Sequence, residues 1–278
     1  MATNKLFHIT AITNLHVGSG KENIGVVDNL IQRDVITNLP IIHSSSLKGA
    51  LRKHFCNNYE KEDKDAIVKY IFGSEASNTL QSEAGKYRFF DAQLLAIPVR
   101  SNKSPYLMAT CPAVIKQYLK TVKLFGITGV DLEFTTPIVF SKDLSGTEIE
   151  DLGDNLTTFS NSDFGNKFKE HIGCDAPIVV LSDNDFDTLC DDNHLPVIAR
   201  NQLNNGESKN LWYEQVLPRF SVLYFPLIAD DKKDEKGNDI FTNFKEYIEG
   251  GLVQIGANAS VGYGFCELKN VTPQPSNK

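Results

Sequence analysis

Cysteine is scarce in this sequence, and the few cysteines present are not spaced for cross-linking or zinc binding. The 278 residues contain five cysteines, which lie far apart and never form a CxxC pair. A disulfide framework needs an even set of cysteines, and a zinc knuckle needs closely spaced pairs. We therefore expect reduced, mostly buried thiols.

Long apolar runs are also missing. No stretch of about 18 consecutive apolar residues occurs, which is the length that a membrane-spanning helix requires. The opening residues, MATNKLFHIT, lack the basic segment and apolar stretch of a secretory signal. The sequence predicts a cytoplasmic protein that does not contact a membrane.

Positive charge is in deficit, but the deficit is local. The chain has 28 Lys and Arg against 35 Asp and Glu, a net charge of −7. Residues 141–195 alone carry 13 acidic and 3 basic side chains, so the rest of the chain is net positive by 3. A nucleic-acid-binding surface needs basic residues only where phosphates lie. We predict one domain over residues 1–278, with residues 141–195 as an acidic insertion.

The common signatures of hydrolases and nucleotide-binding proteins are absent. The sequence contains no GxSxG, HExxH, GxGxxG or Walker spacing. Serine hydrolase, zinc protease and dinucleotide-binding chemistry are therefore not indicated.

The apolar residues that are present follow strand and helix periods in turn. Strands are expected at 5–15, 86–100, 176–182, 194–201 and 219–229, and helices at 44–55, 63–72, 111–126, 183–190 and 241–251. The chain then ends with a strand, a glycine-rich turn and a second strand over 252–269. This order predicts an α+β fold with an antiparallel sheet faced by helices. Two related halves and one elaborated ferredoxin-like unit both fit it.

The polar stretch 14–53 is the strongest candidate for a functional region. It begins with a glycine-punctuated loop that carries His16 and Asp28. Such a pair could transfer a proton from a 2′-hydroxyl that attacks the adjacent phosphate, and Asp28 could instead hold a divalent cation. A loop aspartate is also a common turn or capping residue. Spacing does not decide between these interpretations.

The same stretch ends in SSSLKGALRK, which predicts a helix with a serine N-cap and an apolar stripe. Lys48 and Arg52 lie one turn apart near that helix N-terminus, where backbone N–H groups can bind a phosphate. An ordinary capped surface helix is the alternative.

Two further segments have more than one interpretation. QIGANASVGYG has three glycines whose small size would let backbone amides approach a phosphate, or it is a simple hairpin turn. Tyr263 within it could stack on a base or pack. In NLWYEQVLP, Trp212 is typical of a core anchor, and spacing assigns Glu214 no role.

Together these segments resemble the RAMP superfamily, and most closely the backbone subunits of Cmr-type (type III-B) CRISPR effector complexes. The matching segments are LHVGSG (15–20), GVVDNLIQRD (25–34), LPIIHSSSLKGALR (39–52), FFDAQLLAIPVRS (89–101), VIARNQL (197–203), LWYEQVLP (211–218) and LVQIGANASVGYGF (252–265). The resemblance departs at Asn29 and Leu30, at His43 and Ser44, and at Tyr263, where the family often has proline, proline-glycine and arginine.

The resemblance implies a ferredoxin-like, RRM-type core with inserted subdomains, including a thumb-like hairpin. It further implies several copies stacked along a guide RNA with other Cmr-type subunits, and an endoribonuclease that cuts complementary target RNA at regular intervals. Asp28 would be catalytic and would hold Mg or Mn, with His16 and Glu214 as accessory catalytic residues. The implied RNA-binding residues are Ser45, Ser46, Lys48, Arg52, Gly256, Gly262, Tyr263 and Gly264. The alternative is a non-catalytic guide-binding scaffold.

Overall fold

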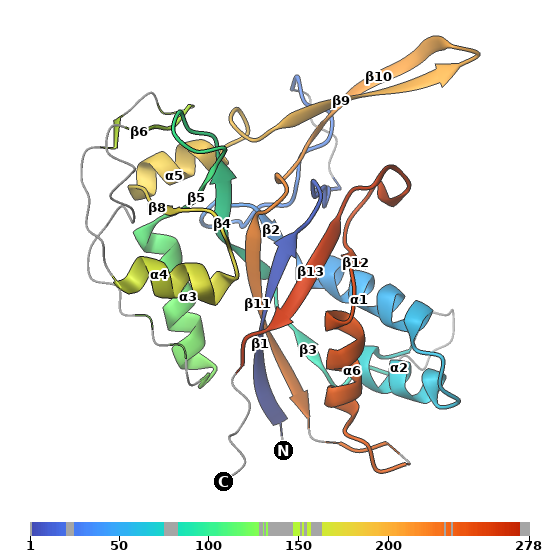
Figure 1. Ribbon diagram of the computed structural model, residues 1–278. Helices are drawn as coiled ribbons and strands as arrows, with labels where there is room; N and C mark the ends of the chain where they lie inside the picture. Colours follow the sequence, from blue (N-terminus) through green and yellow to red (C-terminus); the bar gives the residue numbers. More distant parts are fainter. Residues whose placement is uncertain are drawn as a thin grey trace.

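The fold was examined in a computed structural model of the chain, which describes residues 2–20, 25–74, 83–127, 130, 132, 147–150, 152, 155–156, 163–230, 232–234 and 236–272. Helices pack against one large mixed sheet (Figure 1), which confirms the predicted α+β class. No helix in these ranges is long and apolar enough to cross a membrane.

The large sheet has the strand order β12-β13-β1-β11-β4-β5-β8, with β2 paired to β4 and β3 paired to β11. All its pairs are antiparallel except β5 with β8. The strands are β1 Ala2–Ala11, β2 Ile41–Ile42, β3 Arg88–Phe89, β4 Ala92–Val99, β5 Leu107–Thr110, β8 Ile178–Val180, β11 Val222–Asp230, β12 Val253–Gln254 and β13 Phe265–Asn270. The two central strands, β1 and β11, pair over nearly their whole lengths, from Ala2 with Asp230 to Thr10 with Val222.

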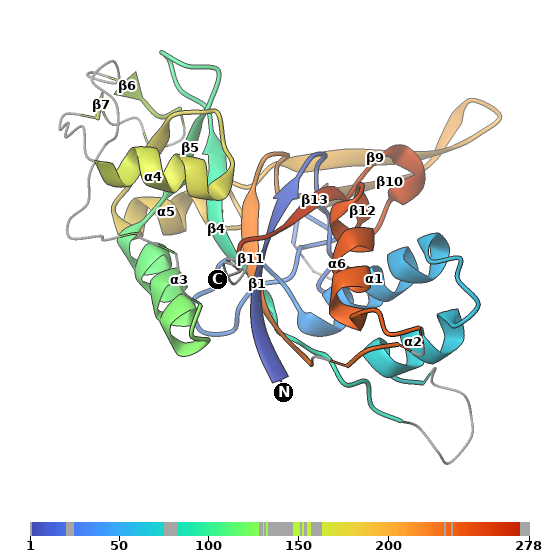
Figure 2. The ribbon, with the colours of Figure 1, turned by 60° about the horizontal axis from the view of Figure 1, so that its bottom comes forward.

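The helices divide into two groups on either side of the central strands (Figures 1 and 2). The first group is α1 Ser44–Asn58, α2 Lys64–Phe72 and α6 Ile240–Glu249, and the second is α3 Pro112–Leu124, α4 Asp163–Ile172 and α5 Asp183–Cys190. In α1 the predicted stripe is buried at Leu47, Leu51 and Phe55. Helix α1 thus turns its apolar stripe inward, as amphipathic periodicity requires.

A two-stranded hairpin projects away from this body (Figures 1 and 2). Its strands are β9 Val197–Asn204 and β10 Glu207–Gln215, which pair with each other in a separate two-stranded sheet. The side chains along most of the hairpin are exposed, whereas Glu214 and Gln215 at its root are buried. The strand predicted at 194–201 is therefore one arm of a projecting ribbon, because it has no further strand or helix to cover it.

The predicted serine N-cap of α1 is wrong. The N-cap residue is His43, whose side chain makes no capping hydrogen bond. The N–H of Ser44 instead donates to Oδ1 of Asp91 at 2.6 Å, from the turn between β3 and β4. A carboxylate at a helix N-terminus is favourable because it accepts an unpaired N–H and interacts with the helix dipole.

The acidic insertion predicted at 141–195 lies partly outside the described residues. Within the part that the structure describes, β6 Thr147–Glu148 pairs with β7 Asn155–Leu156, and β8 adds to the large sheet beside β5. The single domain over 1–278 and the insertion within it remain predictions.

A buried cluster of two histidines and a tyrosine lies between β1 and the helices α3 and α4. Nε2 of His8 is 3.0 Å from the hydroxyl of Tyr118, which also contacts Nε2 of His171. Among described residues, Nδ1 of His8 has no hydrogen-bond partner. Burial lowers the pKa of His8 well below its usual value and that of His171 to about 4, because the charged rings would lose their hydration.

We expect this cluster to make the protein sensitive to acid. Both histidines stay neutral in the folded state but protonate near pH 6.5 in the unfolded state, so unfolding takes up protons below that pH. Stability is therefore fully present above about pH 6.5 and falls toward pH 4 by up to roughly 1.4 kcal/mol per pH unit for each histidine. Thermal unfolding between pH 7.5 and 4.5 would measure this, with His171→Gln expected to show a shallower slope. A melting temperature unchanged over that interval would contradict the prediction.

Candidate functional site

Asp28 lies exposed at the surface on a loop that is fixed to the projecting hairpin. The N–H groups of Asp28 and Asn29 both donate to the carbonyl of Tyr213 in β10, each at 3.1 Å. In return, Oδ2 of Asp28 accepts the N–H of Tyr213 at 2.7 Å. Since one carboxylate oxygen is used in this bond, the other is the one available to a ligand. The loop therefore presents a carboxylate at a defined position beside the hairpin root.

His16 lies beneath the same region and is only 5% exposed. Its Nδ1 is 2.6 Å from the carbonyl of Gln215. A carbonyl can only accept, so Nδ1 carries the proton, and in the neutral ring Nε2 is left as an acceptor. Nε2 faces Gly18, where an added Cβ would stand 3.2 Å from it. The hairpin root thus fixes the tautomer and the orientation of His16.

Glu214 is buried at the hairpin root, and both of its carboxylate oxygens are engaged. Oε1 accepts Nε1–H of Trp212 at 2.8 Å, and Oε2 accepts Nδ2–H of Asn258 at 2.6 Å. Nη1 of Arg200 lies 4.0 Å from Oε2. A buried carboxylate needs such partners because it has lost its hydration. In this chain Glu214 joins the hairpin to the glycine-rich turn.

The glycine-rich turn packs against the loop that carries His16. The N–H of Ala257 donates to the carbonyl of His16 at 2.9 Å, and that of Gly264 donates to the carbonyl of Asn14 at 2.9 Å. Gly256 has a φ of +86°, and a Cβ there would stand 2.3 Å from the carbonyl oxygen of His16. Glycine is required here by both the backbone conformation and the close approach.

Tyr263 lies within reach of the hairpin as well. The guanidinium carbon of Arg200 is 5.6 Å from the centre of its ring, which is cation–π distance. One face of the ring is therefore covered by an arginine from β9. Gly262, beside it, has a φ of +83° with nothing within 4 Å of an added Cβ.

The start of helix α1 is tied to the same loop through Gln32. Nε2 of Gln32 donates to the carbonyl of Gly18 at 3.2 Å and to the hydroxyl of Ser46 at 3.0 Å. Its Oε1 accepts the N–H of His43 at 2.8 Å. Ser45 on this first turn is exposed, and Lys48 and Arg52 follow it as half-buried side chains.

The structure thus brings the predicted residues of three distant segments into one region. His16 and Asp28 come from the first loop, Glu214 from the hairpin root, and Gly256 and Tyr263 from the final turn. The residues that hold them together were not predicted: Gln32, Arg200, Gln215 and Asn258. All four lie within the segments that carry the family resemblance, but an amide side chain has no spacing signal of its own.

The protein side chains of this region could hold a divalent metal ion only together with a phosphate that supplies further oxygen ligands. In the parts of the chain that the structure describes, no group of three or more His, Cys, Asp or Glu side chains could hold a metal ion. Asp28 offers one carboxylate oxygen that is not bonded to Tyr213. Magnesium is commonly bound by one or two carboxylates together with phosphate oxygens and water. The donor set suits Mg or Mn shared with a phosphate, and does not suit a closed protein site.

These features define an α+β protein with a projecting hairpin whose root meets a glycine-rich turn and an aspartate-bearing loop. The sequence pattern of the RAMP superfamily matches residues 8–267. The chain belongs to the RAMP superfamily.

One relative is similar over nearly the whole chain, and a second is similar over about a third of it. The CRISPR system Cmr endoribonuclease Cmr4 of Pyrococcus furiosus is 29% identical over 290 residues, which cover 96% of each chain. The CRISPR system CMR subunit Cmr4 of Saccharolobus solfataricus is 40% identical over 97 residues, which are 35% of this chain and 30% of that protein.

Two solved structures share the fold. Oligomeric Cmr4 from Pyrococcus furiosus superposes with a TM-score of 0.73 at 23% identity and covers 98% of this chain and 100% of its own. A chain of the type III-B Cmr-beta complex bound to cognate target RNA gives a TM-score of 0.76 at 23% identity, covering 96% and 97%. The similarity therefore extends over nearly the whole chain.

Proposed function

We propose that this chain is a backbone subunit of a type III-B CRISPR ribonucleoprotein complex that binds guide RNA in several copies and cleaves complementary target RNA at regular intervals. The relative from Pyrococcus furiosus is named an endoribonuclease, and its similarity to this chain covers 96% of both chains. The observation that carries the proposal is the exposed Asp28, held by two hydrogen bonds to Tyr213 at the hairpin root, with a third bond to Tyr213 from the N–H of Asn29. The complex would act in the cytoplasm.

The finer architecture is part of this proposal. In β1–α1–β4–β11–α6–β13, the four strands stand in the sheet as β13-β1-β11-β4. This element order is that of a ferredoxin-like βαββαβ unit, which supports an RRM-type core. The hairpin β9–β10, inserted before β11, would be the thumb that separates segments of the guide–target duplex.

Copies of the chain would stack head to tail along the guide RNA and contact other Cmr-type subunits. The turn after Arg33 supports such contacts because Val35 and Ile36 are 91% and 90% exposed. The turn is ordered, since Oδ1 of Asp34 accepts the N–H groups of Ile36 and Thr37 at 2.9 and 2.7 Å. Two large apolar side chains on a fixed turn are typical of a surface that another protein covers.

At the site, the chain would hold target RNA so that a 2′-hydroxyl lies in line with its adjacent phosphate. The available oxygen of Asp28 would accept the proton of that hydroxyl or help to hold a Mg or Mn ion. The ion, when bound, would stabilise the charge that develops on the phosphate oxygens. His16 would support the site from beneath the Asp28 loop, and Glu214 would hold the glycine-rich turn against the hairpin. Pairing with the guide would select the target sequence.

The experiment that tests the proposal is cleavage of a labelled target by the assembled complex. The complex with guide RNA should bind a complementary target and, with Mg or Mn, cut it into products of regular spacing. A chelator should stop cleavage, and a target without complementarity should stay intact. A complex that binds target but never cuts it with either metal would favour the scaffold alternative.

We expect Lys48 to contribute a phosphate contact to guide binding. Lys48 stands on the first turns of α1 after Ser45 and Ser46. Replacing it with glutamine should weaken guide binding regardless of sequence and reduce the slope of log K against log salt by about 1. Filter binding at several salt concentrations would measure both. Lys53→Gln, on another face of the same helix, is the matched control and should leave the slope unchanged; equal slopes for Lys48→Gln and wild type would contradict the assignment.

A further inference from the structure

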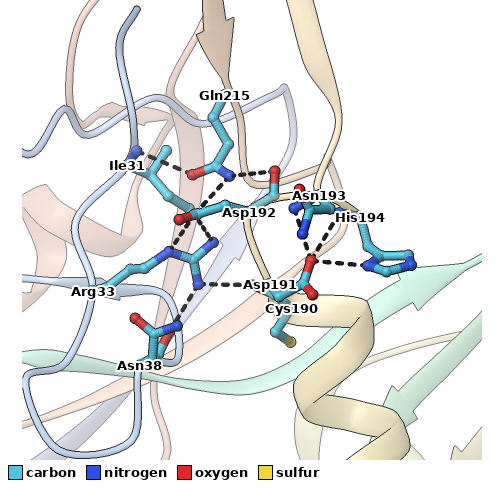
Figure 3. A network of polar contacts seen from close by, with 9 residues as sticks. All are labelled: Ile31, Arg33, Asn38, Cys190, Asp191, Asp192, Asn193, His194 and Gln215. Atoms are coloured by element: carbon cyan, nitrogen blue, oxygen red, sulfur yellow. Dashed lines mark hydrogen bonds and ion pairs between the residues drawn. The ribbon is translucent and has the colours of Figure 1, made fainter. Parts of the chain in front are cut away.

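Arg33 lies at the centre of a polar network that joins three segments distant in sequence (Figure 3). Its Nε donates to Oδ1 of Asp192 at 2.8 Å, and its Nη1 donates to the carbonyls of Asn38 and Cys190 at 2.8 and 2.7 Å. Nη2 also lies 2.8 Å from Oδ1 of Asp192. The guanidinium therefore connects the Asp28 loop, the following turn and the end of helix α5.

The Arg33–Asp192 pair differs from an ordinary surface ion pair. Its arginine side chain is only 11% exposed, whereas the aspartate is 47% exposed. Exposed pairs contribute little because water and salt screen them and both side chains are free to move. Here the planar guanidinium donates hydrogen bonds to three acceptor groups at once, a geometry that the ammonium of lysine does not reproduce.

Gln215 connects this network to the hairpin root and to His16. Its Nε2 donates to Oδ1 of Asp192 at 3.1 Å, and its Oε1 accepts the N–H of Ile31 at 3.3 Å. Its backbone N–H donates to the carbonyl of Asn29 at 2.9 Å, and its carbonyl is the acceptor for His16. Gln215 is fully buried, so these bonds have no competition from water.

The segment from Asp28 to Arg33 is anchored along its whole length. Asp28 is held at Tyr213, Asn29 and Ile31 are bonded to Gln215, and the carbonyl of Leu30 accepts the N–H of Ser19 at 2.8 Å. Arg33 then fixes the far end of the same segment to α5. The N–H of Gln32 also donates to the carbonyl of Val17 at 2.9 Å, so a shift of Arg33 would loosen the segment at the end opposite Tyr213 without detaching it.

We infer that Arg33, acting with Asp192 and Gln215, is a positioning residue that sets Asp28 and His16 relative to the thumb hairpin. Arg33 does not touch the reacting atoms in this arrangement. It holds the aspartate loop and the hairpin root as one body, so that RNA seated against the hairpin meets Asp28 at a fixed distance. The catalytic part of this inference rests on the proposed function, whereas the structural part does not.

The test compares Arg33→Lys with wild type in two measurements. Arg100→Lys is the matched control, because Arg100 also pairs with a carboxylate at 2.8 Å, that of Glu150, on an exposed part of the surface. The first measurement is hydrogen–deuterium exchange of the full chain over residues 25–34. The second is single-turnover cleavage of target by the assembled complex, together with the target dissociation constant.

In Arg33→Lys, we expect the amides of 25–34 to exchange on the order of 10-fold faster, because a loosened segment opens more often. We expect the cleavage rate at saturating target to fall by on the order of 10²-fold, as for a reacting group displaced by about 1 Å. Target binding should change by less than about 3-fold, and Asp192→Asn, which keeps the Oδ1 acceptor but loses the charge, should lie between Arg33→Lys and wild type. Arg100→Lys should match wild type in every measurement.

The two possible failures are distinguishable. Unchanged exchange over 25–34 in Arg33→Lys would overturn the inference, whether or not the complex cleaves. An equal fall in target binding and cleavage would also overturn it, because that is the signature of a lost binding contact. If exchange rises as expected but the wild-type complex does not cut target, the positioning role stands and the proposed endoribonuclease function fails.

Discussion

Asp28→Asn is expected to abolish target cleavage while guide and target binding stay intact. Asparagine keeps an oxygen that can accept the N–H of Tyr213, a bond that Asp28 makes at 2.7 Å. The loop should therefore keep its position, while the negative charge needed for a proton or a metal is lost. Removing a group of this kind lowers rates by roughly 10²- to 10⁴-fold. Single-turnover assays with labelled target would measure it.

Two further variants test the same expectation. Asp28→Ala removes both the charge and the bond to Tyr213, so it should cleave no better than Asp28→Asn. Asn29→Ala is the matched control, because the anchoring bonds of Asn29 use its backbone alone. It should retain near-normal cleavage. If the Asp28→Asn complex cut target at the wild-type rate, Asp28 would not be the catalytic residue, and the scaffold alternative would gain support.

Gly256→Ala is expected to cause a much larger loss of stability than Gly262→Ala, another substitution in the final turn. A Cβ at this position would stand 2.3 Å from the carbonyl oxygen of His16 and 3.1 Å from Cγ2 of Val17, and the φ of +86° disfavours any side chain. Neither the carbonyl nor the turn can move without breaking the bond from Ala257 to His16. We expect a loss of about 3 kcal/mol in the free energy of unfolding, measured by urea titration.

Gly262→Ala separates backbone strain from steric contact. Gly262 also has a positive φ, +83°, but nothing lies within 4 Å of an added Cβ. The loss in the free energy of unfolding for Gly262→Ala should be limited to the backbone strain, which is about 1 kcal/mol. Because Gly256→Ala pushes on His16, it should also reduce cleavage in any molecules that fold, whereas Gly262→Ala should not displace His16. Equal losses of stability for the two variants would show that the close approach at His16 is unimportant.

Both pairs of variants test contacts between segments far apart in sequence. The loop of residues 14–34 is held by the hairpin root near residue 214 and by the turn near residue 257. In its described residues, 14–20 and 25–34, the loop has no regular secondary structure and makes isolated bridges such as that of Asn29 with Glu214. Small shifts in the hairpin or the turn should therefore change activity before they change the fold.

Local periodicity was sufficient to predict most of the elements. The stripe at Leu47, Leu51 and Phe55 predicted α1, and Pro112 near a first turn predicted the start of α3. These signals are local because a helix brings residues three and four apart onto one face, whatever the rest of the chain does. The strand predicted over 86–100 is interrupted into β3 and β4 by a turn at Phe90 and Asp91. That interruption supplies the carboxylate that caps α1.

The sequence by itself determined the α+β class and, through the resemblance of its motifs, the family, and it predicted a catalytic role for Asp28. It did not determine which groups surround that aspartate. Only the tertiary structure placed Gln215 against His16, Asn258 against Glu214, Arg33 against Asp192, and Asp91 at the start of α1. Each of these contacts joins residues 44 to 199 positions apart, where periodicity carries no information. Such contacts are decided by which polar groups become buried together and must then satisfy one another's hydrogen bonds.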